Sequence, residues 1–146
     1  MKKPLIALLS GAALLVLQGC AQGDGTVSDK SRMPCGDRPN CVSSIDPREE
    51  YNVAPFELVS EDVSMPRLVD AVLTMPGARV GAQEPGYARI EFVSSIMRFV
   101  DDVEFRVDGE NLIVRSESRV GYSDFGVNRK RAEALRTLLQ EQGFIK

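Results

Sequence analysis

The spacing of apolar residues changes twice along this chain, and this change limits the fold more than any other feature. Residues 64–77 carry apolar side chains at helical spacing, residues 78–120 alternate apolar with polar side chains, and residues 127–143 return to helical spacing. The sequence therefore predicts a helix, a set of strands and a second helix, in that order. In the second helix, the apolar stripe is expected to consist of Ala134, Leu135, Leu138 and Leu139.

The alternating region divides at turn signals into about four strands. Pro85-Gly86 and Asp108-Gly109 are typical of tight turns between antiparallel strands. After Ser94 the alternation shifts by one residue to Met97 and Phe99, which predicts a bulge or a break. We therefore predict an α+β domain, with an antiparallel sheet of about four strands and two helices packed on one face. The predicted strands are residues 78–84, 87–94, 103–107 and 111–120.

The first twenty residues have the pattern of an export signal. Lys2 and Lys3 precede an apolar stretch, residues 5–17, that is shorter than the roughly 20 residues needed to cross a bilayer. Leu17-Gln18-Gly19-Cys20 resembles a bacterial lipobox, which is cleaved before a cysteine that then carries diacylglycerol. Ala21 after that cysteine favours the outer membrane by the usual sorting rule. An uncleaved anchor or an ordinary signal peptide remains the alternative.

This interpretation divides the chain into three parts. Residues 1–19 are a lipoprotein signal peptide, residues 20–34 a flexible tether rich in glycine and serine, and residues 35–146 a single globular domain. Cleavage removes two lysines and no carboxylate, so 18 basic residues become 16 against 21 acidic ones, a net charge of −5. Because nucleic acids select basic surfaces, we expect no nucleic-acid partner.

The chain has three cysteines and no histidine, which excludes many kinds of chemistry. Catalysis by Ser-His-Asp or Cys-His groups is impossible, as are zinc and haem sites that need histidine. We expect no metal site and no cofactor. Cys35 and Cys41 lie in a stretch rich in turn residues, and the periplasm is oxidising, so a disulfide between them is predicted. A free thiol pair or a transient metal site is the alternative.

The densest polar segment is residues 115–131. It places Arg129, Lys130 and Arg131 near the start of the final helix, where the helix dipole disfavours cations. Something negative should offset these charges. The candidates are Asp124 as a helix cap, the carboxylates of Asp101, Asp102 and Glu104, or a bound anion.

Two other sets of polar residues invite a catalytic interpretation. Asp101 and Asp102 are adjacent in a predicted strand and should point to opposite faces, which makes them a poor catalytic pair. Salt bridges to arginines are the expected role. Ser43 and Ser44 would need lysine or a carboxylate as a base, and are better suited to hydrogen bonding in a turn.

Three segments resemble the signatures of the 1499 domain-of-unknown-function family. They are R-P-N-C-V-S-S, F-V-D-D-V-E-F and S-R-V-G-Y-S-D-F-G-V-N-R-K-R-A-E. The resemblance covers residues 35–143, although Gly36 stands where the family often has proline. It implies a fold and the location of a site, without a known reaction. The matching residues are Cys41, Ser43, Ser44, Asp101, Asp102, Glu104, Ser118, Arg119, Gly121, Ser123, Asp124, Gly126, Asn128, Arg129 and Arg131.

Three functions fit these observations. The first is a non-enzymatic, lipid-anchored periplasmic domain that binds an envelope protein or a small anion. The second is a small hydrolase or lyase that works without histidine, through Asp, Arg and Ser. The third is an assembly role in which the polar residues form a buried network that specifies the fold. The candidate binding residues are Ser43, Ser44, Asp101, Asp102, Arg119, Ser123, Asp124, Asn128, Arg129 and Arg131, with lipid attachment at Cys20.

Overall fold

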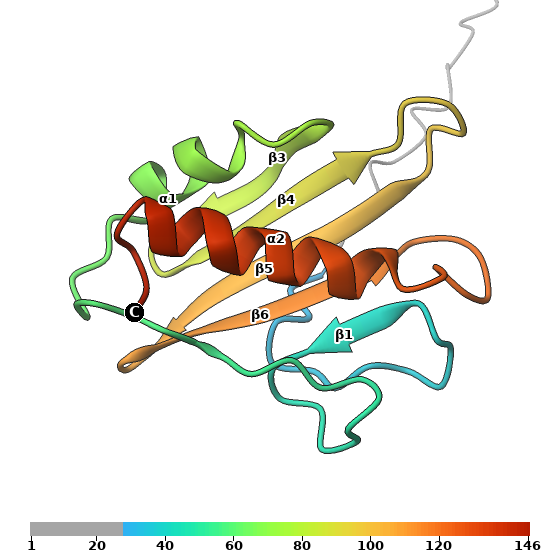
Figure 1. Ribbon diagram of the computed structural model, residues 1–146, viewed down its shortest axis with the longest axis horizontal. Helices are drawn as coiled ribbons and strands as arrows, with labels where there is room; N and C mark the ends of the chain where they lie inside the picture. Colours follow the sequence, from blue (N-terminus) through green and yellow to red (C-terminus); the bar gives the residue numbers. More distant parts are fainter. Residues whose placement is uncertain (1–27) are drawn as a thin grey trace, which may run out of the picture.

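The computed structural model describes residues 28–146. The predicted signal peptide, the predicted lipid attachment at Cys20 and tether residues 20–27 lie outside the described residues. One antiparallel sheet is covered on one face by two helices (Figure 1). The elements are β1 (Cys41–Ser43), β2 (Phe56–Glu57), α1 (Met65–Val72), β3 (Ala78–Glu84), β4 (Tyr87–Val93), β5 (Val100–Asp108), β6 (Asn111–Ser118) and α2 (Val127–Glu141).

The sheet confirms the predicted α+β class but has six strands, so the predicted number of about four was wrong. Its order is β1-β6-β5-β4-β3, and β2 pairs with β6 beside β1. The two additional strands have three and two residues and lie in the proline-rich segment that precedes α1. Strands this short show no measurable alternation, and they exist because the edge of β6 offers backbone partners.

The predicted tight turns are present, one of them shifted by a residue. Pro85-Gly86 joins Glu84 to its partner Tyr87. Between β5 and β6 the turn is Gly109-Glu110, because Asp108 still pairs with Asn111. Gly109 has a φ of 59°, a conformation that a side chain would disfavour.

The shift in alternation after β4 is a break in the sheet. Residues 94–99 form a loop, closed by hydrogen bonds that Ser94 and Phe99 exchange. Met97 and Phe99, at which the shifted alternation predicted a bulge or a break, are exposed residues of this loop. The β4–β5 loop therefore carries apolar side chains that take no part in the core.

The helices and one face of the sheet enclose the core. α1 begins after Ser64, which makes no side-chain cap, and has Pro66 in its first turn. In α2 the predicted stripe was partly wrong, because Ala134 is exposed and Leu138 only half-buried. The buried stripe runs along the helix as Asn128, Ala132, Leu135 and Leu139.

The opposite face of the sheet is polar, and we call it the second face. Alternation places Tyr87, Arg89 and Glu91 of β4 there, beside charged residues of β5 and β6. The described part of the predicted tether, residues 28–34, lies against it: the Lys30 amide donates to Glu104 Oε1 at 2.8 Å. Within residues 28–146, no helix is both long and apolar enough to cross a membrane.

Candidate functional site

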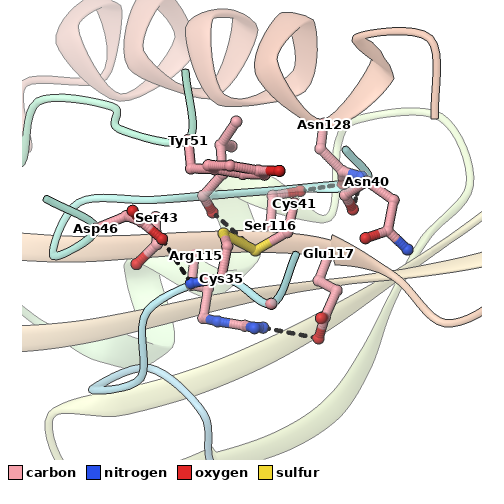
Figure 2. The surroundings of a disulfide bond; sticks show 12 residues. Cys35, Asn40, Cys41, Ser43, Asp46, Tyr51, Arg115, Ser116, Glu117 and Asn128 are labelled. Carbon is pink, nitrogen blue, oxygen red and sulfur yellow. Dashed lines mark hydrogen bonds and ion pairs between the residues drawn. A yellow bond between two sulfur atoms is a disulfide. The ribbon is translucent and has the colours of Figure 1, made fainter. Parts of the chain in front are cut away.

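Asn128, in the first turn of α2, is the centre of the polar segment. Its side chain is completely buried, and it occupies a position where the helix stripe would otherwise be apolar. Its Nδ2 donates to the Asn40 carbonyl oxygen at 3.0 Å and to Ser118 Oγ at 2.9 Å. Its Oδ1 accepts from Ser116 Oγ at 2.5 Å. One side chain thus ties α2, β6 and the start of β1 together (Figure 2).

Asp124 satisfies the free amides at the start of α2. One carboxylate oxygen accepts from the Gly126 amide at 2.9 Å, and the other accepts from the Asn128 amide at 2.8 Å and from Asn128 Nδ2 at 2.7 Å. Asp124 thus supplies the predicted negative charge at the helix start, but from two residues before the N-cap position, which Gly126 occupies in a left-handed conformation. Ser123 has a local role, since its hydroxyl accepts from the Phe125 amide.

Asp101 and Asp102 point to opposite faces of the sheet, as strand alternation predicts. On the helix face, Arg131 Nη2 donates to Asp101 Oδ2 at 2.7 Å, and Arg131 Nη1 donates to Asn128 Oδ1 at 2.9 Å. The guanidinium also lies 4.8 Å from the centre of the Phe92 ring. Asp101 therefore offsets one of the three cations at the start of α2.

On the second face, Asp102 pairs with Arg119. The guanidinium donates from Nε and Nη2 to the two carboxylate oxygens, at 2.7 and 2.8 Å, and Nη2 also reaches Glu91 at 2.5 Å. A paired geometry of this kind is strong and directional. These bonds raise the pKa of Arg119 above its ordinary value. Asp102 therefore forms an ion pair with Arg119 and does not offset the cations at the start of α2.

Arg129 is held by backbone oxygens and not by a carboxylate. Its Nη1 donates to the Asn52 carbonyl and its Nη2 to the Glu50 carbonyl, both at 2.9 Å. The helix is thereby joined to the loop that follows β1. Lys130, between Arg129 and Arg131, is exposed.

Ser43 and Ser44 lie in and just after β1, and their hydroxyls bond to backbone. Ser43 is fully buried, and its Oγ accepts from the Ile45 amide at 3.3 Å. Ser44 Oγ both donates to the Val114 carbonyl at 3.2 Å and accepts from the Val114 amide at 3.1 Å. Ser44 thus extends the pairing between β1 and β6, while Ser43 Oγ makes a local bond. Among residues 28–146, neither hydroxyl is hydrogen-bonded to a carboxylate or a lysine.

The predicted disulfide joins Cys35 to Cys41 at the start of β1 (Figure 2). Both cysteines are buried with Tyr51. Asp46 accepts from the Cys35 amide at 2.8 Å and forms an ion pair with Arg48 at 2.9 Å. The hydrogen bonds from Arg48 hold the pKa of Asp46 well below its ordinary value. Asp46, which the sequence did not single out, fixes the shape of this corner.

Glu104 is the most deeply buried carboxylate on the second face. Tyr87 donates to its Oε1 at 2.8 Å, and Arg115 lies 4.0 Å from its other oxygen. Burial raises the pKa of Glu104, and burial together with the bond to Glu104 raises the pKa of Tyr87. Arg115 has a closer partner in Glu117, at 2.8 Å. The sequence placed Glu104 in a signature but gave no sign of its bond to Tyr87.

The structure therefore brings six of the ten predicted binding residues together in two groups, one on each face of the sheet, while Ser43, Ser44, Ser123 and Arg129 bond to backbone elsewhere. The helix-face group contains Asp101, Asp124, Asn128 and Arg131, and the second-face group contains Asp102 and Arg119. An open groove of about 530 Å³ lies elsewhere, between the start of α1 and the β3–β4 turn, and no predicted residue lines it. No group of three or more acidic, cysteine or histidine side chains in residues 28–146 is arranged to bind a metal ion.

Comparison with known proteins identifies the family. No curated protein and no solved structure matches the chain. Residues 33–139 match the family described as "Protein of unknown function (DUF1499)". This match covers more than half of the chain and includes the disulfide, the whole sheet and most of α2. The chain therefore belongs to the DUF1499 family, the same family that its three signature segments resemble.

Proposed function

We propose that the chain is a lipid-anchored domain on the periplasmic side of the outer membrane, attached through Cys20, which works by binding or assembly and not by catalysis. The observation that carries this proposal is the internal pairing of the signature residues. Asp101 and Asp102 each have an arginine partner, and the Asn128 side chain makes five hydrogen bonds to other described residues. These groups stabilise the fold and leave the surface between them to carry the function.

The two serines support the same proposal. A hydrolase that lacks histidine needs a serine within hydrogen-bond reach of a carboxylate or lysine. The Ser43 hydroxyl is buried, and the Ser44 hydroxyl is engaged with both backbone groups of Val114. A fluorophosphonate probe should therefore leave the purified protein unlabelled. Labelling that disappears in Ser44→Ala would instead favour the hydrolase.

The anchor is tested by replacing Cys20. The lipobox pattern predicts that cells fed an alkyne fatty acid will label the protein, and that Cys20→Ser will abolish the label and cleavage before residue 20. Cys35→Ser is the matched control, because it changes a cysteine outside the lipobox and should keep the lipid. A labelled Cys20→Ser protein would contradict the anchor.

A further inference from the structure

Two loops at one end of the sheet expose large apolar side chains. The β4–β5 loop, residues 94–99, and the β6–α2 loop, residues 119–126, lie at the same end of the molecule (Figure 1). They are adjacent, since the Arg119 amide donates to the Val100 carbonyl at 3.0 Å. We call their exposed apolar side chains the apolar tip, and they are Ile96, Met97, Phe99, Val120, Tyr122 and Phe125.

The exposure in the apolar tip is unusual in degree. Phe125 is 89% exposed, Ile96 87% and Tyr122 72%. Single exposed apolar residues are common, but a group of six on two adjacent loops marks an interaction surface. These side chains add nothing to the core, and covering them would remove apolar surface from water, which is favourable.

The backbone of the same two loops is strained. Among residues 28–146, Arg98 and Phe125 are the non-glycine residues with positive φ, at 57° and 54°. This region disfavours side chains, and phenylalanine is a poor choice for it. One strained residue lies in each loop of the apolar tip. Strain of this kind is often retained where it places a side chain for function.

Charge distinguishes this end of the molecule from the other. Three exposed cations lie in or beside the apolar tip, with the exposed Asp37 next to one of them. Arg98 lies within the tip, Lys130 in the first turn of α2, and Arg38 beside the β6–α2 loop, where the Asp124 amide bonds to the Pro39 carbonyl. The opposite end carries an excess of acidic residues, among them Glu57, Glu61, Asp62, Glu84, Asp108, Glu110 and Glu141. Near a negatively charged surface, such a charge distribution would orient the molecule with the apolar tip facing that surface.

The predicted anchor is within reach of this surface. Eight residue steps separate Cys20 from Ser28, and an extended chain spans at most about 28 Å over that length. Lys30 is fixed at Glu104, four residues along β5 from Val100, or roughly 13 Å. A lipid on Cys20 would therefore allow the apolar tip to meet the membrane surface.

We propose that the apolar tip docks on the bilayer, with its apolar side chains among the lipid tails and Arg98, Lys130 and Arg38 at anionic headgroups. This inference rests on the proposed lipid anchor, and it adds a second contact that orients the domain. Aromatic side chains with cations beside them suit the boundary between headgroups and tails. The acidic end would then face the periplasm and remain open to a partner.

The absence of tryptophan from the chain allows a direct test. Phe125→Trp places a single fluorophore in the apolar tip, and Tyr122→Trp provides a second position there. Val59→Trp is the control, at a residue 55% exposed near the β5–β6 turn. The full lipid-anchored protein is reconstituted in vesicles of phosphatidylethanolamine and phosphatidylglycerol, with or without lipids brominated on their tails.

Bromine quenches tryptophan only at close range, so brominated lipid should reduce the emission of Phe125→Trp and Tyr122→Trp and leave that of Val59→Trp unchanged. The control lies beyond the length of β6, about 26 Å for eight residues. Replacing phosphatidylglycerol by a neutral lipid should weaken the quenching, and so should adding Arg98→Glu and Lys130→Glu.

Flotation of the vesicles separates failure of the anchor from failure of the docking. Protein that floats with the vesicles while both apolar-tip tryptophans stay unquenched would overturn the docking and keep the anchor. Equal quenching at Val59→Trp would also overturn it, because no particular end would then face the lipid. Protein that does not float would overturn the anchor and the docking that rests on it. Circular dichroism of each variant checks that it is folded.

Discussion

Replacing Asn128 by alanine tests whether the signature residues form a structural network. The substitution removes five side-chain hydrogen bonds from a fully buried site. Four of the partners keep other bonds or contact with solvent: for example, the Asn40 carbonyl still accepts from the Ser118 amide, and Arg131 still reaches Asp101. Ser116 Oγ is the partner that would be left buried without another hydrogen bond within residues 28–146.

The magnitude follows from these two classes of partner. A buried hydroxyl without a partner costs about 1–3 kcal/mol, and each of the other four bonds contributes a net ~0.5 kcal/mol or more. Alanine favours the helix over asparagine by about 0.5 kcal/mol, which offsets a little of the loss. We therefore expect Asn128→Ala to lower the free energy of unfolding by about 3–4 kcal/mol. Such a protein remains folded if its stability is typical of small domains.

Urea denaturation followed by circular dichroism measures this loss. At an ordinary m-value, the midpoint should fall by roughly 2 M, with the m-value unchanged. Thr137→Ala is the matched control in α2, because its exposed hydroxyl makes only a local bond to the Glu133 carbonyl, and it should change stability by less than about 0.5 kcal/mol.

A double-mutant cycle identifies the source of the loss. Ser116→Ala removes the hydroxyl that Asn128→Ala leaves without a partner, so the double variant should be about 1–3 kcal/mol more stable than the sum of the single losses predicts. A loss below about 1 kcal/mol for Asn128→Ala, or strict additivity in the cycle, would refute the network. The signature residues would then be free to serve a ligand.

Three further predictions concern the loops around β1. Arg129→Ala should cost about 1–2 kcal/mol in urea denaturation, because it removes two charge-assisted bonds to backbone carbonyls, and Arg129→Lys should recover only part of this loss. Asp46→Asn should be less stable than the unmodified protein at neutral pH and should lose less stability on acidification. The folded pKa of Asp46 lies below its ordinary 3.8, so its contribution is complete above about pH 4 and declines as the pH falls below that value; parallel pH curves for the two proteins would contradict this role. Replacing Cys35 and Cys41 together by alanine should cost about 2 kcal/mol, as loop entropy predicts for a separation of six residues, and the unmodified protein in reductant should show the same loss. If the alanine variant loses stability but the unmodified protein in reductant does not, the alanines and not the missing bond cause the loss.

The longer elements could be predicted from the sequence because each carries several periods of its pattern. The register on the second face could also have been worked out. Once the turn pairs Asp108 with Asn111, Glu104 must face Arg115 and Asp102 must face Glu117. The strands β1 and β2 could not be found this way, since they depend on the edge of β6 and not on a pattern of their own.

The roles of the signature residues were harder to predict than their positions. Asn128 occupies a stripe position in α2, three turns before Leu139, and a polar residue at such a position indicates a buried hydrogen-bonding site. That signal was present in the sequence. The bonds from Arg129 to Glu50 and Asn52 were not predictable, because they depend on the path of an irregular loop across the start of a helix.

The third signature segment reverses the usual arrangement of side chains. Its polar members, such as Ser118, Asn128 and Arg131, turn inward and bond to one another, while Tyr122 and Phe125 turn outward. The inward bonds fix both ends of the β6–α2 loop, so the loop can hold Phe125 in a strained and exposed conformation. The network and the apolar tip are therefore two parts of one structure. If this is correct, Asn128→Ala should also weaken the bromine quenching of a tryptophan at position 125, whereas Thr137→Ala should leave it unchanged.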